Sequence, residues 1–342
     1  MSTRGGRTHL TFASLVIPLV LVVGLLMWLA TLEQTPGRRS SRSFQPAAGN
    51  TWPAVEPVTF DANGLALPKK LGSLRFAVIG DVGRGDVAQY DTATEMARWW
   101  NQFDFSLVLM LGDNMYAAGT PEDYAARFER PYKVLLDAGV VFQAANGNHD
   151  PASILTYPPF NMNGNRYYTF TRNEGPLGPV AARTVRFFAI DTVMLDPEQL
   201  GWLRRELGKS DDGWEICFYH HPLYTSGRYS LAAVRLRSVL EPILVRYGAD
   251  VALAGHEHFY ERLIPQRGIL HFTSGAGGAL RVGDIRPSRL TAAGFDTDTH
   301  FMLMEISGDD LYFQAISRTG KTIDAGHVKR VDHPAPPPSI GR

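Results

Sequence analysis

The sequence predicts an α/β domain with a second sheet packed on the first. Two patterns predict this fold class. Short apolar runs alternate with segments of helical periodicity through most of the chain, and the last apolar runs follow one another with no helical segment between them. With 342 residues, of which 44% are hydrophobic, the chain is long enough to bury one large core or two smaller ones.

Nine apolar runs predict the strands. The first six are almost continuously apolar, which is typical of strands that are buried on both faces of a sheet. The predicted strands are Leu74–Ile79, Leu107–Leu111, Val140–Ala144, Val185–Ile190, Glu215–Tyr219, Val251–Ala254, His271–Ser274, Phe301–Ile306 and Leu311–Ile316.

Four helices are predicted between these strands. They are Val87–Gln102, Pro121–Ala138, Pro197–Leu207 and Leu231–Tyr247. The third has a clear start, because Asp196 is a preferred N-cap residue and Pro197 suits the first helical position. The resulting β-α-β-α-β order is typical of an α/β domain.

The N-terminal residues predict a membrane anchor. Leu10–Leu32 carries no charged residue, and as a helix it would span roughly 34 Å, enough for the hydrocarbon core of a bilayer. A cleavable signal peptide has an apolar region of only about 7–15 residues, so we expect a retained signal anchor, with cleavage left open. Residues 1–9 would be a cytoplasmic stub, and the domain would lie outside the cytoplasm, or be secreted after cleavage.

The remaining segments, the charge and the cysteine content set further bounds. Residues 33–70 predict a flexible tether and residues 331–342 a proline-rich tail, which leaves one domain at 71–330. Lys+Arg and Asp+Glu both total 34, so the chain has no basic field and we expect no nucleic-acid partner. Cys217 is the single cysteine, which excludes an internal disulfide, and its apolar surroundings predict a buried thiol.

Five polar segments close apolar runs, most of them beside a glycine that lets the backbone turn sharply. They are Ile79–Gly83, Leu111–Tyr116, Gly147–Asp150, Tyr219–Pro222 and Gly255–His258. Each alone would be an ordinary turn, but their conjunction at strand ends, where α/β domains bind ligands, predicts a metal site. Carboxylate, amide and imidazole donors suit iron, zinc or manganese. A shared carboxylate can bridge two ions about 3.5–4 Å apart, an arrangement used for displacement at phosphorus.

The order GD, GDNxxY, GNHD, HxP and GHxH resembles the signature of the calcineurin-like metallophosphoesterases. Within them the sequence is most similar to the purple acid phosphatases, including the tartrate-resistant type, over nearly all of residues 74–328. The resemblance implies a four-layer α/β/β/α sandwich. It also implies a dinuclear-metal phosphate ester hydrolase of the acid phosphatase type, in which a metal-bound hydroxide attacks phosphorus in line with the leaving group.

Carried over residue by residue, the resemblance implies an Fe(III) site and a site for a divalent ion (Fe, Zn or Mn). The iron site would be formed by Asp81, Tyr116 and His258, the divalent site by Asn148, His220 and His256, with Asp113 bridging the two. Asp113 and His149 would be catalytic. The substrate would be bound by Asn148, His149, His221 and Arg228.

Gly83 and Tyr116 distinguish this sequence from many other metallophosphoesterases. Those proteins carry Asp-x-His in the first motif, and Gly83 stands here in place of that metal-binding histidine. Tyr116 follows Asp113 by three residues, where purple acid phosphatases place an iron-binding tyrosinate. A phenolate is a hard anionic donor and favours Fe(III).

The loop after the fourth motif departs from the family pattern. Many relatives have a further histidine there, suited to protonating the leaving group, but Tyr224–Tyr229 contains none. Arg228, a permanent cation, is the candidate to bind phosphate in its place. The sequence does not identify the residue that would protonate the leaving group. Two other functions also stay open: a phosphodiesterase or nucleotide pyrophosphatase on the same metal core, and a non-catalytic phosphate-binding protein. The expected partners are a small phosphorylated substrate and, through the N-terminal helix, a membrane.

Overall fold

A computed structural model describes residues 54–173, 183–209 and 213–331, all within the compact unit Ala47–Arg342. The candidate anchor, Leu10–Leu32, and nearly all of the proline-rich tail lie outside these residues. Within the part that is described, no helix is long and apolar enough to cross a membrane.

The first sheet has six strands in the order β13-β12-β11-β1-β2-β3. Its strands are β1 (Leu74–Ile79), β2 (Leu107–Met110), β3 (Val141–Ala144), β11 (His300–Ser307), β12 (Asp310–Ser317) and β13 (Thr322–Lys329). β1, β2 and β3 are parallel, and the three C-terminal strands add to β1 as an antiparallel meander.

The second sheet has seven strands in the order β10-β8-β9-β7-β6-β5-β4. They are β4 (Tyr168–Asn173), β5 (Thr184–Ile190), β6 (Trp214–Tyr219), β7 (Val251–Ala254), β8 (Tyr260–Leu263), β9 (Leu270–Ser274) and β10 (Thr291–Phe295). β5, β6, β7 and β9 pair in parallel, and antiparallel strands flank them on both sides.

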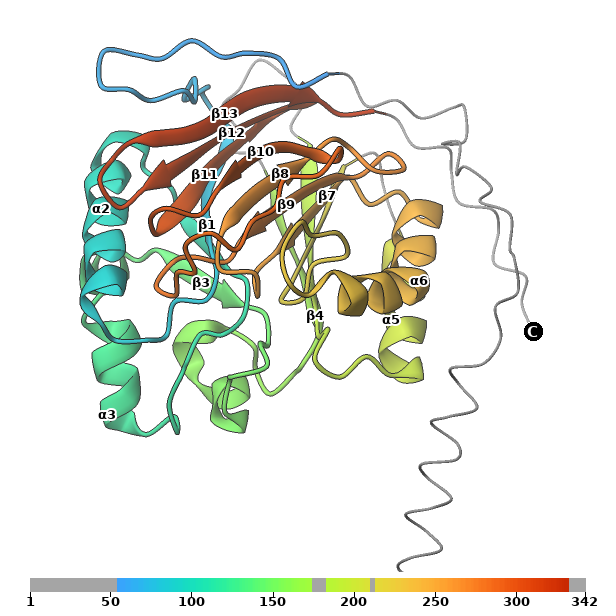
Figure 1. Cartoon of the computed structure of the whole chain (residues 1–342), viewed down its shortest axis with the longest axis horizontal. Coiled ribbons are helices and arrows are strands. Elements are labelled where there is room, and N and C mark those ends of the chain that lie inside the picture. Colours follow the sequence, from blue (N-terminus) through green and yellow to red (C-terminus); the bar gives the residue numbers. More distant parts are fainter. Residues whose placement is uncertain (1–53, 174–182, 210–212, 332–342) are drawn as a thin grey trace, which may run out of the picture. The chain divides into compact units, whose positions relative to one another are not determined.

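Helices cover the outer face of each sheet (Figure 1). α2 (Val87–Phe103), α3 (Pro121–Tyr124) and α4 (Lys133–Asp137) accompany the first sheet, and α5 (Pro197–Leu207) and α6 (Ser230–Arg246) the second. As predicted, Asp196 caps α5 by accepting a bond of 2.8 Å from the Gln199 N–H, and Pro197 follows at the first position.

The side chains of β1 explain why the two sheets stack. Successive residues of a strand point to opposite faces. Phe76 and Val78 join the buried cluster between the sheets, whereas Ala77 and Ile79 join a second cluster that includes Trp99 of α2. A third cluster lies between the second sheet and α5 and α6. The predicted α/β/β/α sandwich is confirmed.

The predicted helix Pro121–Ala138 is wrong as a single element. It consists of α3, a π-helical turn at Ala125–Glu129 and α4. Pro131 stands between the last two, and it can neither donate the helical hydrogen bond nor avoid a clash with the preceding turn. Four strands were also not predicted, namely β4, β8, β10 and β13, because they are short or lack a continuous apolar run.

The described part of the expected tether, residues 54–70, packs against the domain. Leu65 and Leu67 are 2% and 3% exposed. The Ala66 N–H donates to the side chain of Gln314, and the N–H groups of Lys69 and Lys70 donate to the carboxylate of Glu305. The domain therefore begins before residue 71. The sequence did not predict this packing, because two buried leucines and a few backbone donors hold the stretch and leave no periodic signal.

Candidate metal centre

The two sheets bring the five predicted loops together at the carboxyl ends of their strands. Asp81 follows β1 and Asp113 follows β2 in the first sheet, while His220 and His256 follow β6 and β7 in the second. Hydrogen bonds join the loops of the two sheets at this point, and two of them involve predicted ligands of the second sheet. The His256 N–H donates to Asp81 Oδ2 at 2.8 Å, and His220 Nδ1 lies 3.0 Å from the Leu111 carbonyl oxygen.

One donor cluster matches the predicted iron site. The Tyr116 hydroxyl lies 3.2 Å from Asp81 Oδ1 and 3.3 Å from His258 Nε2, and these last two atoms are 3.2 Å apart. Asp81, Asp113 and His258 are all buried, with ligand atoms that lie within 4.8 Å of one another. Three oxygen donors and one imidazole therefore converge here.

A second cluster adjoins the first. His220 Nε2 lies 2.9 Å from Asn148 Oδ1, 3.2 Å from His256 Nδ1 and 3.3 Å from Asp113 Oδ1. Asp113 thus belongs to the first cluster and contacts the second, as expected for a bridging carboxylate. His221 also lies within reach of His220 and His256, so this side of the site offers one more imidazole than the ligand set we predicted.

The donor atoms fit metal ions by both spacing and chemistry. Two donors bound to one ion at about 2.0–2.2 Å lie roughly 3.0–3.4 Å apart, close to the distances above. Burial raises the pKa of Asp81, and the neighbouring charge of Asp113 adds to the shift. Burial lowers the pKa of His258 to about 4 and that of His256 to about 2, so both imidazoles stay neutral and keep a lone pair for a metal. Buried anionic oxygens beside neutral imidazoles are stabilised by a cation.

Three predicted ligands have left-handed backbone conformations that non-glycine residues rarely adopt. The φ angles are 57° at Asp81, 50° at Asp113 and 68° at His256. Such residues cost of order 1–3 kcal/mol each and cluster at functional sites. The surrounding loops hold them there. At Gly147, for example, an added Cβ would lie 2.0 Å from the Asp113 nitrogen, so only glycine permits this approach.

Close packing explains why glycine occupies position 83. A Cβ atom there would lie 2.2 Å from the carbonyl oxygen of Asn114, and the Gly83 carbonyl accepts a bond of 2.9 Å from the Tyr116 N–H. The loop that carries Tyr116 therefore fills the space that a histidine at position 83 would need. Burial raises the pKa of Tyr116, as do the charges of Asp81 and Asp113, so its ionised form requires a cation beside it.

Two acidic residues within the motifs have positioning roles that the sequence did not reveal. Asp150 accepts bonds of 2.8 Å from the Met115 N–H, the Gly147 N–H and the Asn114 side chain, and so joins the second and third loops. Glu257 is fully buried and accepts bonds from the Thr225 hydroxyl and the Tyr229 N–H. In the sequence, the only indication of these roles is that Asp150 lies in the GNHD motif and Glu257 in the GHxH motif. The motifs do not show which groups the two carboxylates bind.

The predicted substrate-binding residues lie around the clusters. His149 is exposed, its N–H donates to Asp113 Oδ1 at 2.8 Å, and its ring lies 4.9 Å from that of Tyr116. The His221 ring is 4.3 Å from that of His256. The Arg228 guanidinium donates two hydrogen bonds to Asp284, so a bound phosphate would have to share the guanidinium with that carboxylate. Phosphate binding by Arg228 stays a prediction.

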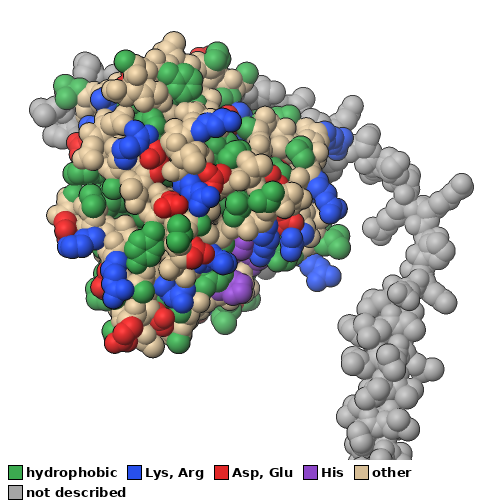
Figure 2. All heavy atoms as spheres, turned by 60° about the vertical axis from the view of Figure 1, so that its left-hand side comes forward, with side chains coloured by type: hydrophobic (Ala, Val, Ile, Leu, Met, Phe, Trp, Pro, Cys, Tyr) green, Lys and Arg blue, Asp and Glu red, His purple; other side chains and the backbone are tan. Residues whose placement is uncertain are grey.

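Histidine side chains also reach the protein surface. The face shown in Figure 2 has them gathered at one place, with Lys and Arg side chains beside them. Cationic side chains around a binding site attract anionic ligands.

A protein-family model described as calcineurin-like phosphoesterase matches residues 74–260. Tartrate-resistant acid phosphatase type 5 of Rattus norvegicus is 24% identical in an alignment of 304 positions that covers 77% of this chain and 92% of that protein. Fe(3+)-Zn(2+) purple acid phosphatase 12 of Arabidopsis thaliana is 29% identical over 205 residues, covering 55% of this chain and 43% of that protein.

Two solved structures share the fold. Purple acid phosphatase PPD1 from yellow lupin (Lupinus luteus) seeds superposes with a TM-score of 0.63 and 18% identity, covering 78% of this chain and 55% of that one. GAP50, described as the anchor in the inner membrane complex of Plasmodium, gives a TM-score of 0.68 and 19% identity, covering 77% and 90%. With the family match over more than half of the sequence, this chain belongs to the calcineurin-like phosphoesterase family and is a metal-dependent phosphoester hydrolase.

Proposed function

We propose that this protein is a phosphomonoester hydrolase of the purple acid phosphatase type that uses two metal ions. The position of Asp113 is the observation that carries the proposal. Its carboxylate groups with Asp81 and His258 and also lies 3.3 Å from His220 Nε2, so one side chain reaches both donor clusters. Two ions that share a carboxylate are suited to holding the attacking and leaving oxygens of a displacement at phosphorus.

Each cluster suits a different ion. Asp81, Tyr116 and His258, with Asp113, are rich in anionic oxygen and would hold Fe(III). Asn148, His220 and His256, with Asp113, would hold a divalent ion such as Fe, Zn or Mn. When bound, the two ions would supply positive charge to the phosphate and lower the pKa of a water molecule.

The protein's own groups prepare the site for this chemistry. The His149 N–H donates to Asp113 Oδ1 and fixes the orientation of the shared carboxylate. The imidazole of His149 is exposed beside it, where it can donate a hydrogen bond to a phosphate oxygen. The left-handed backbone at Asp81, Asp113 and His256 is in place without substrate, so the donors need little rearrangement on binding.

The experiment combines metal analysis with two model substrates. We expect two metal ions per chain, and faster hydrolysis of p-nitrophenyl phosphate than of bis-p-nitrophenyl phosphate. Faster hydrolysis of the diester would favour the phosphodiesterase alternative. Two tightly bound ions with no hydrolysis of either ester would favour a phosphate-binding protein.

The variant Asp113→Asn tests the shared carboxylate directly. It removes one negative charge between the clusters, so we expect it to lose nearly all activity and at least one metal ion. Asp137→Asn is the matched control, because Asp137 is an exposed residue that pairs with Lys133 at the surface. An Asp113→Asn protein with two tightly bound ions and near-normal turnover would contradict the assignment.

We also propose that residues 10–32 anchor the protein in a membrane, with the catalytic domain outside the cytoplasm. The uncharged length of this segment supports the proposal. Alkaline extraction of membranes that contain the full-length protein tests it, since a peripheral protein would be released.

A further inference from the structure

Of the described residues, the three most exposed large hydrophobic side chains all follow strands that end at the metal centre. They are Leu231, Val87 and Val282, with exposed fractions of 82%, 74% and 70%. Val87 begins α2 after the loop of β1, Leu231 lies in the first turn of α6 after the loop of β6, and Val282 lies in the loop after β9. Each of these strands pairs in parallel with a strand that carries a predicted ligand at its end. The three side chains are therefore on the same face of the domain as the donor clusters.

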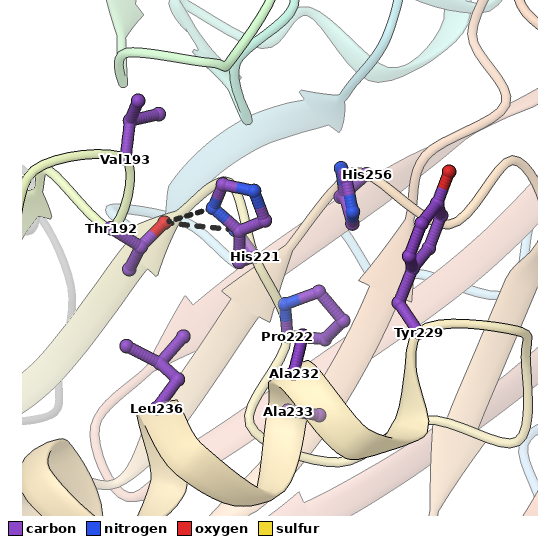
Figure 3. Close-up of a pocket in the computed structure, with 9 residues that line it drawn as sticks. All are labelled: Thr192, Val193, His221, Pro222, Tyr229, Ala232, Ala233, Leu236 and His256. Atoms are coloured by element: carbon purple, nitrogen blue, oxygen red, sulfur yellow. Dashed lines mark hydrogen bonds between the residues drawn. The ribbon is translucent and has the colours of Figure 1, made fainter. Parts of the chain in front are cut away.

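The loop after β5 adds two apolar side chains to this face and is held in place by hydrogen bonds. Val193 and Met194 are exposed, and their N–H groups donate to the buried carboxylate of Asp191 at 3.0 and 3.2 Å. The Thr192 hydroxyl lies 3.1 Å from His221 Nδ1 and accepts a bond of 2.9 Å from the His221 N–H (Figure 3). An ordered loop loses little conformational entropy when it meets a partner. We call the five exposed side chains the apolar rim: Val87, Val193, Met194, Leu231 and Val282.

Basic residues accompany the apolar rim. Residues 220–240 form the loop after β6 and the first part of α6, and they contain three arginines and no Asp or Glu. Residues 275–290, in the loop after β9, contain three arginines and one acidic residue. In the loops after β1 and β5, Asp86 and Asp196 are each paired with an arginine. Exposed apolar side chains beside basic ones are typical of surfaces that bind the headgroup region of an anionic bilayer.

The metal centre lies close to the protein surface. His149 is exposed, and the rings of His221 and His256 are half-buried. The phosphate of a lipid lies in the headgroup layer, and an interfacial protein surface enters a bilayer by only about 5–10 Å. A rim that enters this layer would therefore bring the donor clusters to a lipid phosphate without removing the lipid from the bilayer.

The chain itself gives a reason for a bilayer to be the partner. Residues 10–32 are the proposed membrane anchor, and residues 33–53 connect them to the described domain. This connection can extend over at most about 70 Å. A surface held within that distance is present at a high effective concentration, so a docking contact that is weak by itself still forms.

We propose that the apolar rim docks on the bilayer, and that the site hydrolyses a phosphomonoester carried by a membrane lipid. The inference rests on the proposed phosphomonoesterase activity and on the proposed anchor. In the reaction, the oxygen of water bonds to phosphorus while the bond from phosphorus to the lipid oxygen breaks. A proton of the water passes to the lipid oxygen, so the products are inorganic phosphate and a lipid alcohol.

A labelling experiment tests docking without using activity. Cys217 is the single cysteine and is buried, so a cysteine introduced at the surface can be labelled selectively. Full-length Leu231→Cys and Val282→Cys proteins carry a nitrobenzoxadiazole dye, in vesicles of phosphatidylcholine and phosphatidylglycerol that contain nitroxide-labelled lipids. Val134→Cys is the matched control, because Val134 is exposed on α4, which leads to the amino end of β3 at the opposite edge of the sheet.

A competition experiment tests the substrate. The full-length protein receives vesicles that contain dioleoyl phosphatidate together with an equal bulk concentration of glycerol 3-phosphate, which has the same ester bond and no acyl chains. The rates of diacylglycerol and glycerol formation give the ratio of kcat/KM for the two esters. The double variant Leu231→Glu/Val282→Glu places two carboxylates on the rim, and Val134→Glu is its control.

We expect the dye at Leu231→Cys and Val282→Cys to be quenched at least about twofold more strongly than the dye at Val134→Cys. The wild-type protein should prefer phosphatidate. The double glutamate variant should lower that preference by about tenfold, because its carboxylates are repelled by the anionic headgroups, and it should keep its rate with glycerol 3-phosphate. Val134→Glu should behave as wild type.

The results that overturn the inference differ from those that overturn the proposed function. Equal quenching at all three positions overturns docking. Hydrolysis of glycerol 3-phosphate without a preference for phosphatidate overturns the lipid substrate and leaves the phosphomonoesterase activity in place. A protein that hydrolyses neither ester, yet shows the expected quenching, supports the docking surface and overturns the proposed activity.

Discussion

The contact between Gly83 and the Tyr116 loop leads to a quantitative prediction for Gly83→Ala. The new Cβ would lie 2.2 Å from the Asn114 carbonyl oxygen and 2.4 Å from the Met115 Cα atom. Both are backbone atoms, so no side-chain rotation can relieve the overlap. Inserting one methyl group into a packed site typically costs about 1–3 kcal/mol, and we expect the upper end of that range here.

The steric overlap in Gly83→Ala should also disturb the first metal site. To make room for the methyl group, the loop must move away from Gly83, and Tyr116 moves with it. We therefore expect Gly83→Ala to lose iron and the tyrosinate charge-transfer absorbance along with stability. Urea denaturation gives the free energy of unfolding, and elemental analysis with visible absorbance gives the state of the site.

Gly201→Ala is the matched control for this substitution. Gly201 lies within α5, and the nearest atom to an added Cβ is Arg205 Nη1 at 3.4 Å, the end of a flexible side chain. Alanine stabilises a helix interior by up to about 1 kcal/mol relative to glycine, so this variant should gain stability and keep its metal. If the free energy of unfolding of Gly83→Ala instead lies within about 0.5 kcal/mol of the wild-type value and the variant binds iron fully, the packing argument is wrong.

Three further predictions concern the metal centre, its rim and the N-terminus. The oxidised protein should be pink to violet, and Tyr116→Phe should lose the colour while retaining the fold and part of the activity; a colourless wild-type protein replete with iron would refute the assignment. If Arg228 binds phosphate, Arg228→Ala should lower kcat/KM by about tenfold, with Arg235→Ala as an exposed control on α6; unchanged kinetics on several substrates would exclude that role. A chain beginning at Asn50 should be soluble without detergent and active, because the compact unit begins at Ala47; precipitation or loss of metal would show that the preceding residues belong to the fold.

The sequence predicted the fold class and the strand-end loops because both leave a local signal. A buried strand is an apolar run, and a ligand-type residue directly after it lies at the edge of the sheet. The clusters at Asp81 and His220 followed from this reasoning with the family resemblance. Strands at or near a sheet edge leave no such apolar run and were missed. In β13 (Thr322–Lys329), for example, only Gly326 and Val328 are buried.

Other features of the site depend on contacts between distant segments. Asp150 joins two loops, and Glu257 positions Tyr229 across 28 residues of sequence. Neither partner can be read from local composition, because each bond forms only once the sheets have packed. The ion pair of Arg228 with Asp284, 56 residues away, is of the same kind. The sequence identifies donor types, but the tertiary structure decides which donor meets which acceptor.

The location of the donors on both sheets has a mechanical consequence. Asp81 and Asp113 extend from one sheet, and His220 and His256 extend from the other. An ion held by donors from both sides crosslinks the two layers, much as a disulfide joins two segments. The free energy of metal binding then adds to the cohesion between the layers. A chain with a single buried thiol, Cys217, can in this way obtain a reversible crosslink whose strength varies with metal supply.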